Sequence, residues 1–270
     1  MAALGLDATP EVWTDGRVRW DAFDLVVANG AWDNIHRPAE FLEWVDLVAG
    51  TGVPLVNAPA TLRWNIDKRY LGDLEVAGVP TVRTTWVGAG QVAEAARVPL
   101  PDGEVVVKPA VSGGGFRTAR YEVAEHDRAR AHVADLVSAG ATAMIQPYQS
   151  SVDADGEVGV IMLGGMVSHA ITKGAMIRRG AGARDTLVGN ETIGPASPDV
   201  AQLGVAVQVL GAAEAVHGPT AYARIDLVRL DDGSPSVLEL ELLDPALFFE
   251  QHPQSALRFA RVLRDRIHEA

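Results

Sequence analysis

The sequence predicts a mixed α/β protein, in which a small parallel α/β unit precedes two subdomains of α+β type. Two observations support this fold class. Short apolar runs alternate with helical patterns along all 270 residues. In the first third these runs are separated by helices, as in a parallel sheet, whereas several later runs follow one another as hairpins. We place the three units at residues 1–63, 64–149 and 150–270.

The first unit is expected to contain two strands separated by one helix. The apolar run at residues 23–30 predicts a buried strand, and residues 53–59 predict a second, shorter one. The helix between them spans residues 38–50, with Pro38 in its first turn and Gly50 at its end. This strand–helix–strand order is typical of a parallel sheet.

The second unit follows a helix that bridges it to the first. Thr61 is expected to cap this helix, which carries Lys68 and closes at Gly78. Strands are then expected at 81–87, 104–110, 117–123 and 142–148, and helices near 92–97 and at 125–140.

The third unit contains two hairpins and two helices. Gly164-Gly165 and Asp232-Gly233 are tight-turn dipeptides, so each is expected to join two strands. The expected order is an acidic linker at 150–157, a hairpin at 158–173, a polar loop at 174–194, a helix at 197–216 capped by Ser197, a hairpin at 223–245, and a helix at 254–270.

Composition and charge exclude several classes of function. The net charge is −12 and no run is rich in lysine or arginine, so nucleic acid is not expected as a partner. No apolar run has the length of a membrane span, and the first residues lack the pattern of a secretory signal. Cysteine is absent, which excludes disulfides, thiolate metal sites and a cysteine nucleophile. We therefore expect a cytoplasmic protein without a membrane partner.

The second hairpin of the third unit carries charges on one face. Side chains alternate along a strand, so Arg224 and Asp226 share a face. The predicted turn places Asp226 opposite Glu239 and Arg224 opposite Glu241, about 5 Å apart at Cβ. Opposed carboxylates destabilise a sheet unless a cation compensates, and a divalent metal ion would do so. A solvated polar face with an Arg–Glu pair is an equally good interpretation of the hairpin alone. The other face is expected in the core, with Ile225, Leu227, Leu238, Leu240 and Leu242.

A glycine-rich loop follows the strand that ends near Lys108. Gly113, Gly114 and Gly115 let backbone N–H groups approach a phosphate closely, and a lysine at a strand end adds a positive charge. A strand follows and the GK[ST] signature is missing, so this is not a P-loop. The alternative is a hairpin loop beside an incidental lysine.

The strand at 142–148 ends in the sequence Gln146-Pro147-Tyr148. A planar base could lie against such a strand end and bond to its backbone. Taken in isolation, a plain strand end with a surface tyrosine is the better interpretation. The motif gains weight only from its place between the glycine loop and the charged hairpin.

The order of these motifs resembles the ATP-grasp superfamily of carboxylate–amine ligases. A helical lysine is followed by a strand-end lysine, a glycine loop, "QPY", and then "RID", whose aspartate lies thirteen residues before the first glutamate of "ELE". D-alanine–D-alanine ligases have a similar "RID…LLEAN" hairpin with the same spacing, and glutathione synthetases have a similar "Q-x-Y" hinge. The resemblance spans roughly residues 65–250.

The resemblance implies a fold in which a nucleotide is held between two α+β subdomains, with ATP and Mg²⁺ as cofactors. Arg224 would stabilise the acyl-phosphate and the tetrahedral intermediate. The implied ATP-binding residues are Lys68, Lys108, Gly113, Gly114, Gly115, Gln146 and Tyr148. The implied metal ligands are Asp226, Glu239 and Glu241.

This sequence departs from the family in three places. Glu241 stands where the family usually has asparagine, which adds charge to the metal site. Gly159 stands where glutathione synthetases carry a basic residue. The chain also begins near what would be the end of the family's N-terminal domain, so either the start is truncated or the first sheet is smaller.

Several other residues are candidates for substrate binding. Trp32 and Asp33 follow the first strand, where α/β domains bind ligands, although Trp32 serves equally well as a core residue. His169 and Lys173 lie on a strand and Arg184 in the polar loop. A lone strand histidine is more often structural, and a solvated loop is nearly as good an interpretation for the basic residues.

Together the motifs predict an ATP-dependent ligase that activates a carboxylate as an acyl-phosphate and joins it to an amine. Small-molecule carboxylates and amines would be its partners, and a homodimer is left open. The "ELE" ending and the tryptophan–aspartate segment resemble the branch that includes the D-cycloserine cyclo-ligase. The alternatives are a nucleotide-binding regulatory protein without turnover and an ATP-grasp phosphotransferase.

Overall fold

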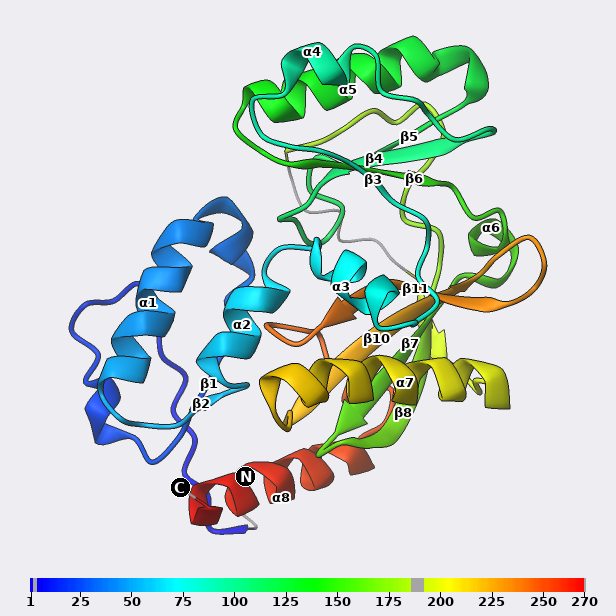
Figure 1. Cartoon of the computed structure of the whole chain (residues 1–270). Helices are drawn as coiled ribbons and strands as arrows, with labels where there is room; N and C mark the ends of the chain where they lie inside the picture. The colour runs from blue at the N-terminus through cyan, green and yellow to red at the C-terminus, as the bar shows by residue number, and fades with distance from the viewer. Residues whose placement is uncertain (2–3, 186–191, 270) are drawn as a thin grey trace.

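Three sheets lie along the chain in sequence order. The computed structural model describes residues 1, 4–185 and 192–269. A two-stranded sheet comes first, then a four-stranded sheet of order β3-β6-β4-β5 and a five-stranded sheet of order β11-β10-β7-β8-β9 (Figure 1). The expected mixture of a parallel unit with antiparallel subdomains is therefore found.

The first sheet is small and parallel. Strands β1 (Val26–Val27) and β2 (Leu55–Val56) pair in parallel, and α1 (Pro38–Gly50) packs beside them. The strand expected at 23–30 is shorter because the chain then turns to another partner. Asn29 Nδ2 donates to the Pro245 carbonyl at 3.2 Å, and Gly30 N donates to Asp244 Oδ1 at 2.5 Å. Two short 3₁₀ helices flank β1, η2 (Trp20–Ala22) and η3 (Trp32–His36).

The single helix expected from Thr61 to Gly78 is instead two helices, α2 (Pro59–Asn65) and α3 (Tyr70–Val76). Thr61 lies inside α2 and does not cap it. The helix breaks because the backbone N–H of Lys68 donates to the Ala110 carbonyl at 3.0 Å, and the Asp67 carboxylate accepts the next free N–H, that of Arg69. This break brings Lys68 against the four-stranded sheet.

The four-stranded sheet is antiparallel throughout and has helices on one face. Its core contains residues of α4 and α5 packed on the strands, and Figure 1 shows these helices on the outer side of the sheet. The elements are β3 (Thr85–Val87), α4 (Val92–Ala95), β4 (Val105–Pro109), β5 (Ala119–Tyr121), η4 (Val123–Glu125), α5 (His126–Ser138) and β6 (Ala143–Pro147).

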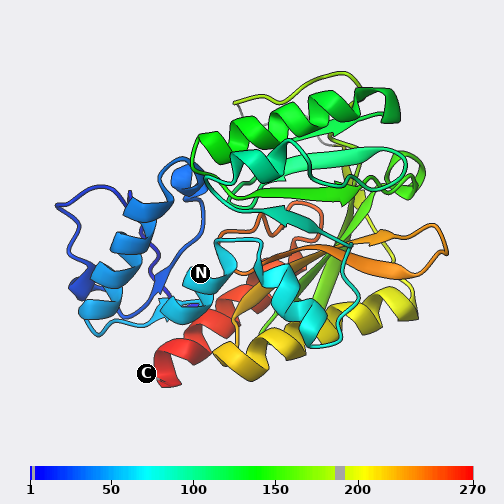
Figure 2. The same ribbon diagram turned by 45° about the horizontal axis from the view of Figure 1, so that its top comes forward.

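The five-stranded sheet is also antiparallel. Its elements are β7 (Glu157–Leu163), β8 (Met166–Lys173), β9 (Ile193–Pro195), α7 (Val200–His217), β10 (Tyr222–Arg229), β11 (Pro235–Glu241) and α8 (Gln254–Glu269). Figures 1 and 2 show α7 and α8 on the side of this sheet that faces away from the four-stranded sheet. The two sheets therefore present their other faces to each other.

Three local predictions in this unit are corrected. The linker expected at 150–157 contains the short helix α6 (Ser151–Asp155), and its last residue already belongs to β7. Asp199, and not Ser197, caps α7, because its carboxylate accepts the Gln202 N–H in a capping box. Within the polar loop at 174–194, residues from 193 form β9; residues 186–191 lie outside the described part of the chain.

Among the described helices, α7 has the length and apolar composition that could span a membrane. In the fold it packs on the five-stranded sheet, with Ala206, Val209 and Leu210 buried in the main core. The apolar character of α7 is thus used in part for packing within the protein.

The outer edge of β11 is covered by residues that precede the four-stranded sheet. Asn65 Nδ2 donates to the Leu240 carbonyl at 2.8 Å, and its Oδ1 accepts the Leu242 N–H at 2.7 Å. Tyr70 Oη accepts the Leu240 N–H at 2.9 Å. Further along, the backbone at residues 80–82 exchanges hydrogen bonds with Val237. Side chains and a short backbone segment thus take the place of a neighbouring strand.

Candidate active site

A cavity of about 540 Å³ is lined by residues from all three units. Its walls come from η3, from the α2–α3 break, from the four-stranded sheet with its glycine loop, and from the β10–β11 hairpin. Of the residues predicted from the sequence, it is lined by Trp32, Lys68, Lys108, Gly113, Gly114, Gly115, Gln146, Tyr148, Lys173, Arg224, Glu239 and Glu241. Asp226 lies directly beneath, fully buried.

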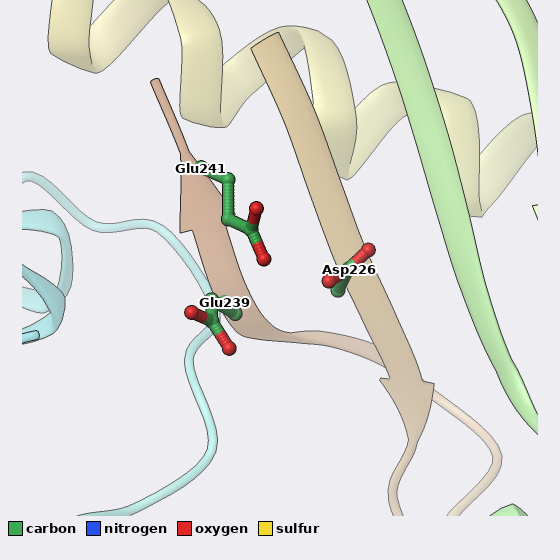
Figure 3. Close-up of side chains that lie close together, drawn as sticks. All are labelled: Asp226, Glu239 and Glu241. Atoms are coloured by element: carbon green, nitrogen blue, oxygen red, sulfur yellow. The ribbon is translucent and has the colours of Figure 1, made fainter. Parts of the chain in front are cut away.

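Three carboxylates gather on the hairpin (Figure 3). Asp226 comes from β10, and Glu239 and Glu241 come from β11. One oxygen from each lies within 4.8 Å of the other two. The register is the predicted one, with Asp226 paired to Glu239 and Arg224 to Glu241. Carboxylate oxygens at this spacing can ligate one hard divalent cation.

Two buried cations hold Asp226 in place. Arg224 Nε donates to its Oδ1 at 2.9 Å, and Lys173 Nζ donates to its Oδ2 at 2.8 Å. Lys173 also pairs with Glu157 at 2.8 Å, and Arg224 pairs with Glu241. Burial alone would raise the pKa of Asp226, but the charges of Arg224 and Lys173 outweigh it and lower that pKa to about 2. Asp226 is therefore a carboxylate at neutral pH.

Glu241 is in a different electrostatic position. Burial raises its pKa to about 7; the charge of Arg224 opposes this rise, while the nearby Glu239 and Asp226 reinforce it. A group of this kind ionises more readily when another cation arrives beside it. The charge of Glu241 therefore depends on what occupies the cavity.

Lys68 and Lys108 face this carboxylate cluster from the other wall. Lys68 Nζ lies 3.0 Å from Glu239 and also donates to the Ser112 carbonyl, at the start of the glycine loop. Lys108 is 8% exposed and forms no ion pair with any described residue. Burial lowers the pKa of Lys108. Lys108, predicted to end its strand, is thus buried in the wall of the cavity.

One part of the cavity is apolar. Val106, Val152, Val228 and Leu238 line it beside the Gln146-Pro147-Tyr148 strand end. Leu238 was expected in the core, but the register shifts by one residue between Asp226 and Leu227. This β-bulge gives the core position to Val237 and leaves Leu238 on the cavity wall.

Gln146 and Tyr148 already have protein partners. Gln146 Nε2 donates to Thr84 Oγ1 at 2.9 Å. Tyr148 Oη donates to Asp153 at 2.7 Å, and the guanidinium of Arg120 lies 3.3 Å from the centre of its ring. Both side chains are therefore fixed before any ligand binds.

The glycine loop touches the first unit. Gly114 and Gly115 have φ of +52° and +73°, conformations that few other residues adopt easily. A Cβ on Gly113 would lie 3.6 Å from Ile35, and the ring of Phe116 meets that of His36 edge-on at 4.8 Å. The glycine loop thus rests on η3, and both line the cavity.

Some of the candidate substrate residues line the cavity and others lie outside it. Trp32 is 58% exposed and lines the cavity. Asp33 does not line it, because its carboxylate bonds to Trp13 and pairs with Arg37. His169 is buried outside the cavity, where Nε2 lies 2.9 Å from the Leu247 carbonyl and the ring stacks on that of His252. Arg184 is exposed and outside the cavity too.

Two acidic residues that line the cavity were not predicted from the sequence. Glu157, treated as part of a linker, is the β7 residue paired with Lys173. Asp244 follows β11 and lines the cavity; one oxygen accepts the Gly30 N–H and the other has no partner in the described structure. Burial raises the pKa of Asp244 to about 7. The signal in the sequence that could have identified Asp244 is the "LLDP" turn that follows the charged strand.

Comparison with known proteins identifies the family of this chain. The family model for the N-terminal domain of D-cycloserine synthetase DcsG matches residues 1–57. The cycloserine biosynthesis protein DcsG of Streptomyces lavendulae is 37% identical over 272 residues, which cover 98% of this chain and 90% of that protein. The crystal structure of D-cycloserine synthetase DcsG matches with a TM-score of 0.89 at 37% identity, over 98% of this chain and 91% of that one.

More distant structures share the fold. D-alanine–D-alanine ligase from Bacillus anthracis, complexed with ATP, has a TM-score of 0.57 at 13% identity, over 92% of this chain and 79% of that one. The ATP-grasp ligase PsnB, complexed with minimal precursor, Mg and ADP, has a TM-score of 0.53 at 19% identity, over 84% of this chain and 68% of that one. The predicted ATP-grasp fold is thereby confirmed, and the chain belongs to the DcsG family of ATP-grasp ligases.

Proposed function

We propose that this chain is a magnesium- and ATP-dependent ligase that closes a ring within one small molecule. Family and fold make it an ATP-dependent ligase that joins a carboxylate to an amine. The observation that supports the proposal best is the cavity itself, where three carboxylates within 4.8 Å of one another face Lys68 and Lys108.

The residues present suit Mg²⁺ and a triphosphate. Asp226, Glu239 and Glu241 offer the hard oxygen ligands that Mg²⁺ prefers, and they lie close enough to share one ion. When bound, Mg²⁺ would neutralise phosphate charge during phosphoryl transfer. Lys68 and Lys108 would contact the phosphates.

Other parts of the cavity suit the remaining groups of ATP. Gly113, Gly114 and Gly115 would cover the phosphates, because their backbone N–H groups can approach closely. The base would lie on the apolar part beside Leu238 and the Gln146–Tyr148 strand end. That part of the cavity offers apolar side chains and the backbone of the strand end.

The chemistry would proceed in two balanced steps. The γ-phosphoryl group of ATP passes to a substrate carboxylate oxygen, which releases ADP and forms an acyl-phosphate. A substrate nitrogen then attacks the acyl carbon, the carbon–oxygen bond to phosphate breaks, and the nitrogen loses a proton as phosphate leaves. Arg224 would stabilise the negative charge that develops on the acyl oxygen, since its guanidinium reaches the cavity while Asp226 holds it.

Ring closure is proposed from the names of the relatives. Cycloserine is a cyclic amino acid derivative whose ring contains an acyl carbon–nitrogen bond, so forming it from an open chain is an intramolecular carboxylate–amine ligation. The 37% identity over almost the whole chain supports the same kind of product here. The substrate would be a D-serine derivative whose side-chain oxygen carries a nitrogen.

A direct test measures ADP release and products together. The protein would be incubated with Mg-ATP and a panel of D-serine derivatives that carry a free or N-acylated aminooxy nitrogen. We expect ADP release that depends on one of them, with a cyclic product seen by mass spectrometry. A stable phosphorylated product would identify a phosphotransferase, and ATP binding without ADP release would identify a regulatory protein.

A matched pair of variants separates the site from general effects of charge. Glu239→Gln should abolish ADP release because it removes a proposed metal ligand that also pairs with Lys68. Asp33→Asn removes a carboxylate outside the cavity and should leave ADP release nearly unchanged. Equal loss in both variants would contradict the assignment of the carboxylate cluster.

A further inference from the structure

Arg120 is a buried arginine at the edge of the four-stranded sheet. It is 4% exposed and lies on β5, opposite Val106 of β4, which in turn lies opposite Gln146 of β6. Directly opposed residues share a face of a sheet, so these three side chains project to the same side. Val106 and Gln146 line the cavity and Arg120 does not. The arginine therefore lies outside the cavity, on the face of the sheet that forms its wall.

Arg120 reaches the cavity through the ring of Tyr148. Its guanidinium carbon lies 3.3 Å from the centre of that ring, and Tyr148 lines the cavity. The ring packs in the apolar cluster that includes Val152 and Leu238, which line the cavity as well. A guanidinium stacked on an aromatic ring is attracted to it, most strongly away from water. Arg120 thus holds a ring of the cavity wall from outside the cavity.

Two carboxylates fix the guanidinium in this position. Arg120 Nη1 and Nη2 donate to the two oxygens of Asp153 at 3.0 and 2.9 Å, and Nε donates to Glu104. Asp153 also accepts the Tyr148 hydroxyl at 2.7 Å, so one carboxylate binds both the arginine and the ring. The hydrogen bonds from Arg120 and Tyr148 lower the pKa of Asp153. An arginine suits this arrangement because its planar fork bonds to carboxylates while its flat face stacks on the ring.

We propose that Arg120 is a positioning residue for the base of ATP, which acts by holding the Tyr148 ring in place before the nucleotide binds. The inference rests on the proposed function, which puts the base beside the Gln146–Tyr148 strand end, and it adds a residue that does not touch the ligand. A ring that is already held loses little freedom when a flat base packs against it, so the base binds more tightly. The triphosphate gains little from Arg120, because two carboxylates offset the charge of the guanidinium.

The test separates the base of ATP from its phosphates. Calorimetry would measure the Kd of Mg-ATP and of Mg-tripolyphosphate, which has neither base nor ribose, in the wild-type protein and in Arg120→Met. We expect the variant to bind ATP about tenfold more weakly, as for the loss of a buried cation–π contact, and to bind tripolyphosphate with the wild-type Kd. The variant should fold, because Glu104 keeps its pairing with Arg179 and Asp153 keeps the Tyr148 hydroxyl.

A double-mutant cycle tests whether the effect passes through the ring. Tyr148→Leu removes the ring, so Arg120→Met should cause no further loss of ATP affinity in that background. Arg258→Met is the matched control, since Arg258 is also partly buried and donates to the Val167 carbonyl at 2.9 Å, away from the cavity. The control should leave the Kd of both ligands unchanged.

Two results would overturn the inference. If Arg120→Met weakens ATP and tripolyphosphate equally, or if its loss adds fully to that of Tyr148→Leu, Arg120 only stabilises the fold. If Arg120→Met does not fold, Arg120→Lys takes its place, because it keeps a positive charge between Glu104 and Asp153 but lacks the planar fork. Wild-type ATP affinity in Arg120→Lys would then overturn the inference. If tripolyphosphate binds too weakly to measure, the double-mutant cycle decides alone.

Failure of the inference can be told apart from failure of the proposed function. Both ligands are measured by binding, without a substrate. If the wild-type protein binds ATP but releases no ADP with any member of the panel, the proposed ligase reaction fails and the test of Arg120 still decides. If the wild-type protein does not bind ATP, both fail together.

Discussion

Gly159→Ala should disturb the buried Asp226 carboxylate through a single methyl group. Gly159 lies on β7, opposite Asp226 on β10. A Cβ built on Gly159 would lie 3.0 Å from Asp226 Oδ1 and 2.9 Å from Ile171 Cδ1, where 3.4–4 Å is ordinary contact. Neither neighbour can move freely, because Arg224 and Lys173 hold the carboxylate and Ile171 is fully buried.

The expected loss is that of an overpacked core, about 1–3 kcal/mol of unfolding free energy. For a chain of this size that corresponds to a fall of roughly 2–12 °C in Tm, at about 2–4 °C per kcal/mol. Thermal unfolding followed by circular dichroism would measure it. A Mg²⁺ titration would show whether the displaced Asp226 carboxylate also weakens metal binding.

A control in the same protein isolates the contact. A Cβ on Gly211, in α7, would meet nothing within 4 Å, so Gly211→Ala should raise stability by about 0.5–1 kcal/mol through helix propensity. If Gly159→Ala melts at or above the parent temperature with unchanged Mg²⁺ affinity, the Asp226 carboxylate is not held as described.

Three further substitutions test the charges of the cavity. Arg224→Lys should retain ATP binding, but the rate of substrate-dependent ADP release should fall by about 10²–10³, because lysine lacks the planar guanidinium that can bond to two oxygens at once. A lower Tm with normal turnover per folded molecule would instead show that Arg224 serves only as the partner of Glu241. Lys108→Met should weaken ATP binding about tenfold or more by calorimetry, yet leave Tm unchanged or higher, because the ammonium is buried without an ion pair; unaltered ATP affinity would refute its phosphate role. Burial raises the pKa of Asp244 from 3.8 to about 7, so the stability tied to its protonated form is present at low pH and is lost as the pH rises from about 4 to 7. Asp244→Asn should therefore gain stability relative to the parent at about pH 8 and not at about pH 4, and urea unfolding that shows the same difference at both pH values would contradict this.

The sequence predicted the register of the charged hairpin and missed its bulge. The alternation of apolar and charged residues and the Asp232-Gly233 turn were sufficient to pair Asp226 with Glu239. The bulge could not be inferred, because Leu238 and its neighbour Val237 are both apolar and either could face the core.

Contacts between residues far apart in the sequence account for the other differences between the predicted and the observed structure. The helix break at Lys68 depends on a hydrogen bond to Ala110, which no local pattern reports. The sequence analysis did not identify Asp244, because its hydrogen bond is to Gly30, 214 residues earlier in the chain. Asp33, by contrast, looked like a site residue in the sequence, and only the structure shows that Trp13 and Arg37 already occupy its carboxylate.

The covered edge of β11 prevents another strand from adding to that side of the five-stranded sheet. An open sheet edge with free N–H and C=O groups invites another strand to add, either as a peptide ligand or as the start of aggregation. Here Asn65 and Tyr70 occupy those groups at Leu240, and residues 80–82 occupy them at Val237. A peptide therefore cannot extend the sheet beside Glu239 and Glu241, and strand addition at this edge is closed both to a peptide ligand and to a second copy of the chain.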